Sequence, residues 1–266
     1  MSIPLFLKDI KNNIVLLLVF GIVMSIYLAV IINMYDPSGA GALMDMLSLL
    51  PVSLVKALGF PTVEADLTGF IAGLYYGFLI YLFPMVYCII LGNRLVAKWV
   101  YEGSFACLLS TPNSRIKIII TQGVYMLFSI LVLFLILYFV GVGLSESLFK
   151  GMLDIALFGK LNFSAGLMTM AIGMICFFFS CVFNDTRLSL AFGAGIPALF
   201  FLLNMIGGLA ERTAFLKDYS LYSIFNGMNL VSGTANAGMI NGLFAVMILF
   251  LFAGSIAIFQ FKRLPI

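Results

Sequence analysis

Charge is scarce in this sequence, and histidine is absent from it. Only 9% of the 266 residues are Asp, Glu, Lys or Arg, while 63% are hydrophobic. A soluble domain usually has about 25% charged residues, so this chain lacks the charge to cover a water-facing surface and belongs in a bilayer. Without histidine, the chain has no side-chain imidazole to act as a base, a proton shuttle or a metal ligand.

Motifs for enzyme chemistry are also missing. No segment matches the G-x-x-x-x-G-K-[ST] pattern of a phosphate-cradling loop, so we do not expect the chain to hydrolyse ATP alone. The four cysteines have no C-x-x-C spacing, which favours small buried thiols over a metal or redox site: Cys88, Cys107, Cys176 and Cys181. We therefore expect no catalytic, cofactor-binding or metal-binding residue in this chain.

Six charge-free runs are each long enough for a spanning helix, which needs about 20 residues. The sequence predicts an all-α membrane protein of one domain, residues 1–266, with spans near 14–33, 69–92, 118–144, 161–183, 188–206 and 239–261. Because these runs contain no Asp, Glu, Lys or Arg, they argue against ion or proton coupling through a titratable side chain in the bilayer. Sodium coupling through carbonyls and hydroxyls stays open.

The basic residues predict how the chain is oriented. Nine of the 14 lysines and arginines fall at the two ends and in the connections after the second and fourth spans, against five in the other connections. Because cytoplasmic segments carry an excess of Lys and Arg, both termini are predicted to be cytoplasmic. Residues 1–13 mix apolar and charged side chains, which suits a short helix lying in the membrane interface.

Two long external connections are expected to hold short elements of their own. Residues 34–68 contain apolar stretches broken by Pro51 and Pro61, which favours interfacial helices. Residues 207–238 lack a spanning run and carry several aromatic side chains, which favours a structured cap or a re-entrant hairpin.

Small residues and hydroxyl groups stand out in the second span. Gly69, Gly73 and Gly77 are spaced by four and predict a flat stripe for close helix packing, within the subunit or between subunits. Three tyrosines and one amide are candidates to line the path of a hydrophobic or amphipathic substrate: Tyr75, Tyr76, Tyr81 and Asn204. Tyr75 and Tyr76 are equally compatible with the aromatic belt at a membrane interface.

The connection between the second and third spans collects charge and is longer than a turn requires. Residues 95–111 contain one glycine, no proline and many good helix formers, so the sequence predicts a helix there that Pro112 ends. Asn113 or Ser114 can cap the next span. Such a helix can lie on the membrane or present a mixed surface to another protein.

The stretch YEGSFACLLSTPNSRIKIIITQ, residues 101–122, resembles the signature of membrane subunits of ATP-binding-cassette exporters of the type-two permease family. That family typically has a Glu, a Gly-Thr or similar pair, a Leu-rich helix and then S-x-P-x-x-R before the third span. The matching residues here are Glu102, Gly103, Leu108, Leu109, Ser110, Pro112 and Arg115. The family usually has a lysine slightly further on, where this chain has Gln122, so the role of Gln122 is open. The segment LSLLPVSLVKALGF also resembles a recurrent Leu-Pro-x-x-Leu segment of the family.

The resemblance implies a division of labour between subunits. A separate ATPase subunit would bind ATP and Mg and dock on the helix 95–111, which would act as a coupling helix. Its contacts would come from Trp99, Glu102, Gly103, Phe105, Leu108, Leu109, Pro112 and Arg115. Residues 1–13 would be the family's elbow helix, and two six-span subunits, identical or not, would enclose the substrate path.

The sequence thus favours a permease subunit of an ATP-driven exporter in the plasma membrane of a bacterium. Its cargo would be a hydrophobic or amphipathic peptide, a lipid or a drug-like molecule, and its partners would be membrane lipid and protein, not nucleic acid. The two alternatives are an ATP-independent secondary transporter or channel and a membrane anchor without transport activity.

Overall fold

The computed structural model describes residues 1–37, 66–101, 103, 114–209 and 211–262. These residues form helices and connecting turns, and no strand occurs among them. The elements are α1 Ile3–Asn33, α4 Leu67–Leu74, η1 Tyr75–Leu79, α5 Ile80–Leu95, α6 Ala97–Tyr101, α8 Arg115–Leu148, α9 Ile155–Val182, α10 Thr186–Leu209, η2 Glu211–Tyr219, η3 Leu221–Ile224, α11 Gly227–Val231 and α12 Ala237–Phe261.

Six helices of this part of the chain are long and apolar enough to cross a membrane. They are Ile3–Asn33, Leu67–Tyr101, Arg115–Leu148, Ile155–Val182, Thr186–Leu209 and Ala237–Phe261. Each predicted span falls on one of them. The predicted all-helical fold with six spans is therefore confirmed, and the chain is a multi-pass membrane protein.

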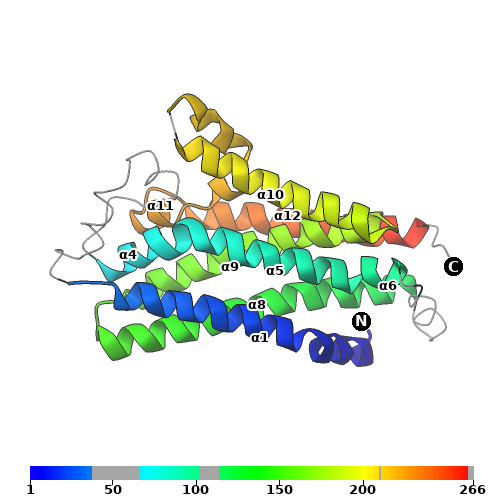
Figure 1. Ribbon diagram of the computed structural model, residues 1–266, viewed down its shortest axis with the longest axis horizontal. Helices are drawn as coiled ribbons and strands as arrows, with labels where there is room; N and C mark the ends of the chain where they lie inside the picture. Colours follow the sequence, from blue (N-terminus) through cyan, green and yellow to red (C-terminus); the bar gives the residue numbers. More distant parts are fainter. Residues whose placement is uncertain (38–65, 102, 104–113, 210, 263–266) are drawn as a thin grey trace.

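The long helices lie side by side in an elongated bundle with α9 near its centre (Figure 1). In the most apolar stretch of α9, 72% of the residues are buried, against 17% in α10 at the periphery. The start of α1 and the end of α12 lie at the same end of the bundle, as six crossings require (Figure 1). That this end is cytoplasmic stays a prediction.

Close packing of α5 on α9 depends on glycine. A Cβ atom at Gly92 would lie 2.9 Å from the Cβ of Cys176 and 3.2 Å from its backbone carbon. A Cβ at Gly173 of α9 would instead meet the ends of two flexible side chains of α8, Ile130 Cδ1 at 2.8 Å and Met126 Cε at 2.9 Å. The contact at Gly92 leaves no room for a side chain, so the backbones of α5 and α9 approach closely there.

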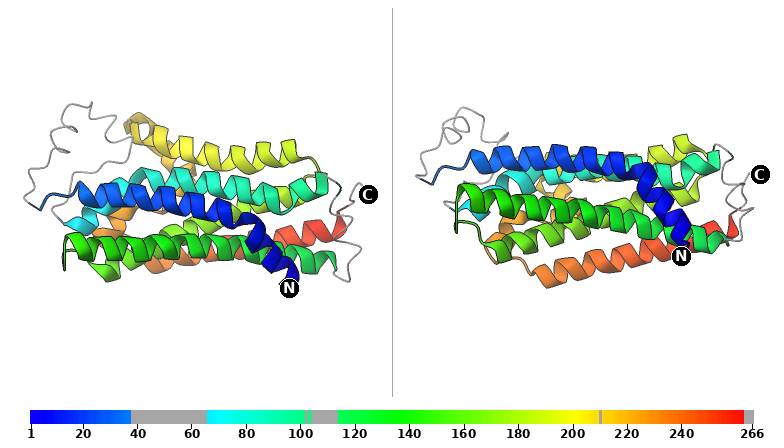
Figure 2. Two further views of the ribbon diagram at one scale, coloured as in Figure 1. Left: turned by 60° about the horizontal axis from the view of Figure 1, so that its bottom comes forward. Right: turned by 90° about the horizontal axis from the view of Figure 1, so that it is seen from below.

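The first helix is longer than a single span needs. At about 1.5 Å per residue, 31 residues extend about 46 Å, against a hydrocarbon core of about 30 Å. The first turns bend away from the axis of the rest of α1 (Figure 2). The predicted short helix at residues 1–13 is therefore the bent beginning of a continuous helix, and its place in the interface stays a prediction.

The chain folds back on itself after α10. The hydroxyl of Thr213 donates to the carbonyl of Ile206 (2.8 Å), and that of Ser220 donates to the carbonyl of Phe200 (2.7 Å). Phe200 lies nine residues before the end of α10, so the chain returns about 14 Å along that helix. We call residues 211–231 the cap. A structured cap was one of the two predictions for 207–238, whereas most of the predicted connection 34–68 lies outside the described residues.

Candidate functional site

Two regions at opposite ends of the bundle contain several of the predicted site residues. One is where α6, the start of α8 and the end of α12 meet, at the end that holds both termini (Figure 1). The other is a pocket under the cap. Both are built from residues that are distant in sequence.

Lys262 follows α12 and bonds to the end of α9. Its ammonium group donates to the carbonyls of Cys181 (2.8 Å) and Phe183 (2.7 Å). The last carbonyls of a helix have no partner within the helix, so the ammonium group satisfies two acceptors that would otherwise stay open. Burial lowers the pKa of Lys262 from 10.5 to about 8, so the side chain still carries its charge at pH 7.

Arg115, the first residue of α8, completes this arrangement. Its guanidinium Nη1 donates to the carbonyl of Lys262 (3.0 Å). The ends of three spanning helices, α8, α9 and α12, are thus joined through one residue. We call Arg115, Lys262 and the carbonyls of Cys181 and Phe183 the helix-end junction. Ser114 caps α8 by accepting from the backbone N–H of Lys117 (3.3 Å), as predicted for this position.

The short helix α6 is attached to the same end of the bundle. The ammonium of Lys8 on α1 lies 5.0 Å from the ring centroid of Trp99, a cation–π distance. The backbone N–H of Ala97 donates to the hydroxyl of Ser180 on α9 (2.8 Å). Trp99 therefore contacts the start of α1, and α6 is held by two other helices.

Gln122, whose role the sequence leaves open, bonds to the start of α1. Its side-chain N–H donates to the carboxyl of Asp9 (3.4 Å), and both side chains are buried. Seven residues before Asp9, the backbone N–H of Ser2 donates to the hydroxyl of Thr121 (2.8 Å), the neighbour of Gln122. These bonds hold the beginning of α1 against α8 and give the buried carboxyl of Asp9 one hydrogen-bond donor.

The predicted coupling stretch begins and ends at this end of the bundle. Trp99 and Arg115 are described there, and Gly103 has a φ of 70°, a left-handed conformation that favours glycine. Helix α5 ends at Leu95, and α6 covers only residues 97–101 of the predicted helix 95–111. Five further predicted contacts lie outside the described residues: Glu102, Phe105, Leu108, Leu109 and Pro112.

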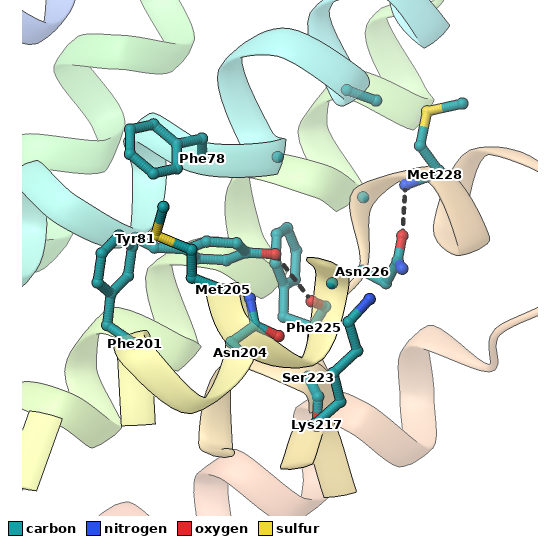
Figure 3. A pocket seen from close by; sticks show the side chains of 14 residues that line it. Phe78, Tyr81, Phe201, Asn204, Met205, Lys217, Ser223, Phe225, Asn226 and Met228 are labelled. Atoms are coloured by element: carbon teal, nitrogen blue, oxygen red, sulfur yellow. Dashed lines mark hydrogen bonds between the residues drawn. The ribbon is translucent and has the colours of Figure 1, made fainter. Parts of the chain in front are cut away.

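The second region, which we call the end pocket, lies between η1, α10 and the cap (Figure 3). The side chains that shape it include Phe78, Tyr81, Phe201, Asn204, Lys217 and Asn226. Two of these, Tyr81 and Asn204, are predicted substrate-path residues that the fold brings together. The sequence reasoning missed Phe78, Lys217 and Asn226.

A π-helical segment forms one wall of the end pocket. Residues Tyr75–Leu79 form a five-residue π-helix between α4 and α5, and Gly77 and Phe78 from it line the pocket. Short π-helical segments inside α-helices are often found at functional sites. This segment also interrupts the predicted stripe of small residues, because Gly69 and Gly73 are buried in α4 whereas Gly77 faces the pocket.

Tyr81 fixes the cap above the pocket. Its hydroxyl donates to the carbonyl of Phe225 (3.0 Å), and its ring lies 5.1 Å from that of Tyr222 between centroids. The hydroxyl proton of Tyr81 is therefore already used within the protein, although its ring borders the pocket.

Tyr75 and Tyr76 lie in the packed interior and do not line the end pocket. Both are fully buried, and their rings contact each other at 5.3 Å between centroids. The hydroxyl of Tyr75 donates to the carbonyl of Met24 on α1 (3.4 Å). These contacts favour a packing role for the two tyrosines.

Lys217 is the only charged residue among those that line the end pocket in the described part of the chain. Its Cγ packs near Gly207, where a Cβ would come within 2.7 Å of it. The pocket thus has one positive charge, amide groups from Asn204 and Asn226, and aromatic walls. This composition suits a ligand that has both a polar and an apolar part.

The cysteines are structural in the described chain. Cys88, Cys176 and Cys181 are buried free thiols, as predicted, and Cys107 lies outside the described residues. The thiols of Cys88 and Cys176 donate to the carbonyls of Thr169 (3.6 Å) and Gly193 (3.1 Å). No group of three or more His, Cys, Asp or Glu that could hold a metal ion occurs within the described ranges.

Comparison of the sequence with models of protein families and with curated proteins gives no match.

Proposed function

We propose that this chain is the permease subunit of an ATP-driven exporter that moves a hydrophobic or amphipathic substrate outward across the plasma membrane. It works with a separate ATPase subunit, which binds ATP and Mg. The observation that carries the proposal is the attachment of both ends of the stretch 101–115 to the ends of spanning helices, through Trp99 on one side and Arg115 on the other.

This arrangement suits the transfer of movement from the ATPase into the membrane. A displacement of the stretch 101–115 acts on Arg115 and, through the carbonyl of Lys262, on the end of α12. The ammonium of Lys262 passes the displacement to the end of α9. Because packed helices move as rigid bodies, a shift at these ends changes the arrangement of whole spans.

The absence of charge within the predicted spans supports an energy source outside them. Transport coupled to protons commonly uses a charged side chain inside the bilayer, and no Asp, Glu, Lys or Arg lies in the six predicted runs. ATP hydrolysis in a partner subunit needs no such group. A second six-span subunit completes the exporter and encloses the substrate path.

The test is to isolate the tagged chain from its native cells and ask whether an ATPase with the G-x-x-x-x-G-K-[ST] motif is bound in fixed ratio. We expect Glu102→Lys to reduce assembly of this complex, because it reverses a charge in the docking stretch. We expect Arg115→Gln to leave the ATPase bound. It should reduce about tenfold the effect that the permease has on the rate of ATP hydrolysis, relative to the free ATPase. The reason is that a charge-assisted bond of about 1.5–3 kcal/mol is lost.

Lys117→Gln is the matched control, because Lys117 is exposed and two residues from Arg115. It should leave both assembly and hydrolysis unchanged. If Glu102→Lys and Arg115→Gln behave like this control, the coupling role is wrong. Uptake into vesicles driven by an ion gradient without ATP would favour a secondary transporter instead.

A further inference from the structure

The end pocket has an apolar side and a polar side. The rings of Phe78, Tyr81 and Phe201 lie on one side of it, and Lys217, Ser223 and Asn226 lie on the other (Figure 3). The rings of Phe78 and Phe201 are 5.7 Å apart between centroids and close the apolar side. A ligand in this pocket therefore meets two different environments.

The polarity of the pocket changes along the axis of α10. Phe201, Asn204, Met205 and Gly208 line the pocket from one face of α10, and Gly208 lies one residue before the end of that helix. Seven residues separate Phe201 from Gly208, which is about 10 Å along the axis. The aromatic side thus lies toward the middle of the bundle, and Lys217, which packs near Gly207, lies at its end.

Two donor groups, the NH₂ of Asn226 and the ammonium of Lys217, lie on the polar side, whereas the hydroxyl oxygen of Ser223 has only acceptor lone pairs left. The side-chain oxygen of Asn226 accepts from the backbone N–H groups of Met228 (3.0 Å) and Asn229 (3.2 Å), so its NH₂ group is left to face outward. The hydroxyl proton of Ser223 is used on the carbonyl of Ser220 (2.8 Å). Lys217 adds an ammonium group with three donors.

The single positive charge of the pocket favours some ligand head groups over others. A single ammonium group with neutral amides beside it matches one negative charge, since a dianion would need a second cation. No carboxylate lines the pocket within the described residues, so a cationic head group would find no counter-charge there. Lys217 is exposed, so its ammonium group stays hydrated beside an uncharged head group and gains a charge-assisted bond only with an anionic one.

We propose that the end pocket binds an amphiphile with one carboxylate head group, placing the carboxylate against Lys217 and the apolar chain between Phe78 and Phe201. This inference deepens the proposed function, on which it rests, because it names the chemical class of the cargo. A long-chain fatty acid and the free C-terminus of a hydrophobic peptide both have this chemistry.

The test measures binding to the full chain in nanodiscs of neutral phosphatidylcholine, with empty nanodiscs as the reference. The probe is cis-parinaric acid, a fluorescent long-chain carboxylate, and the competitor is dodecanoate. We expect saturable binding that dodecanoate displaces and that dodecanol and dodecyltrimethylammonium do not. Lys217→Gln should weaken binding about tenfold, and Lys217→Arg should restore most of it, because a charge-assisted bond is removed and then replaced.

Lys150→Gln is the matched control, because Lys150 is an exposed lysine in the α8–α9 connection at the same end of the bundle. It should bind the probe like the unaltered chain. Lys217→Glu should abolish binding of cis-parinaric acid, because a second carboxylate would then face that of the probe. The proposal is overturned if Lys217→Gln binds normally, if Lys150→Gln loses binding equally, or if dodecanol competes as well as dodecanoate.

Two further measurements are needed. One distinguishes a fatty acid from a peptide as the ligand, and the other tests this inference separately from the proposed exporter function. Displacement by a hydrophobic peptide with a free C-terminus, and not by its amidated form, identifies a peptide as the ligand; no displacement by either identifies a fatty acid. The binding assay contains no ATPase. If the chain binds carboxylates but no ATPase partner is found in native cells, the proposed ligand of the end pocket stands and the proposed exporter function is rejected.

Discussion

The two ends of the bundle are held together by different kinds of bonds. At the helix-end junction, charged side chains donate to helix-end carbonyls at 2.7–3.0 Å, and the elements that meet are long α-helices. At the other end, the hydroxyls of Tyr81 and Ser220 hold a cap made of two 3₁₀-helices and one short α-helix. The charged groups of the helix-end junction are paired with carbonyls, whereas the end pocket is lined by the ammonium of Lys217 and the NH₂ group of Asn226.

This difference fits a division of roles along the chain. Hydrogen bonds from charged groups are about twice as strong as those between neutral groups, and 3₁₀ and π geometry is less favourable than α geometry. The helix-end junction is therefore expected to move as one unit, and the cap is expected to open more readily. An end that receives force benefits from rigidity, and an end that admits a ligand benefits from a cover that can move.

Replacing a closely packed glycine near each end by valine should give the largest difference between the two ends in the free energy of unfolding. Gly92→Val, one turn from the junction end of α5, brings side-chain atoms into the backbone of α9, where even a Cβ would lie 3.2 Å from a backbone carbon. We expect a loss of about 3 kcal/mol in the free energy of unfolding, since two long helices must separate. Thermal unfolding of the purified chain measures it.

Gly227→Val in the cap is the matched substitution. A Cβ there would lie 3.1 Å from the carbonyl oxygen of Ala72 and 3.2 Å from the Cβ of Tyr76. Because the cap can shift as a unit, we expect a loss of about 1 kcal/mol, at the low end for overpacking. Equal losses at the two glycines would mean that the cap is as rigid as the bundle.

Removing one charged side chain tests the rigid end more directly. Lys262→Met keeps the length of the side chain but leaves the carbonyls of Cys181 and Phe183 without their partner. We expect a loss of about 2 kcal/mol, because charge-assisted hydrogen bonds are lost and two acceptors become unsatisfied. Lys117→Met removes an exposed lysine near the same end and should change the free energy of unfolding by less than about 0.5 kcal/mol. A similar loss in both variants would indicate a general effect of charge.

The spans were predictable from sequence because charge is excluded from the bilayer, and hydropathy alone locates helices such as Ala237–Phe261. The continuation of α1 through residues 3–13 was not, since Asp9 depends on a buried partner, Gln122, that lies 113 residues away. The π-helix Tyr75–Leu79 was also missed. The stripe of glycines at every fourth position assumes unbroken α-helical geometry, and one π segment changes which face Gly77 occupies.

Local patterns identified some of the site residues, such as Arg115, Tyr81 and Asn204, but not their contacts. Arg115 stands out because of the motif around it, yet its acceptor is a carbonyl 147 residues later. Lys217 and Lys262 entered the sequence analysis only as charges that set orientation. Their positions, one in a pocket and one at the end of a neighbouring helix, depend on how α10 and α12 pack, which no local spacing encodes.

The smallest expected effect distinguishes local opening from global stability. Tyr81→Phe removes the bond to the carbonyl of Phe225 that fixes the cap, and Tyr87→Phe removes a buried bond to Ser129 that joins α5 to α8. Each change should lower the free energy of unfolding by about 1 kcal/mol, the usual net value of one hydrogen bond.

In hydrogen exchange, Tyr81→Phe should speed exchange within residues 211–231 several-fold and leave the spans unchanged, because it frees only the cap. Tyr87→Phe should instead lower protection across the spans, because α5 and α8 open only with the rest of the bundle. If Tyr81→Phe also speeds exchange in α9, the cap and the bundle unfold together, and the two ends do not differ in rigidity.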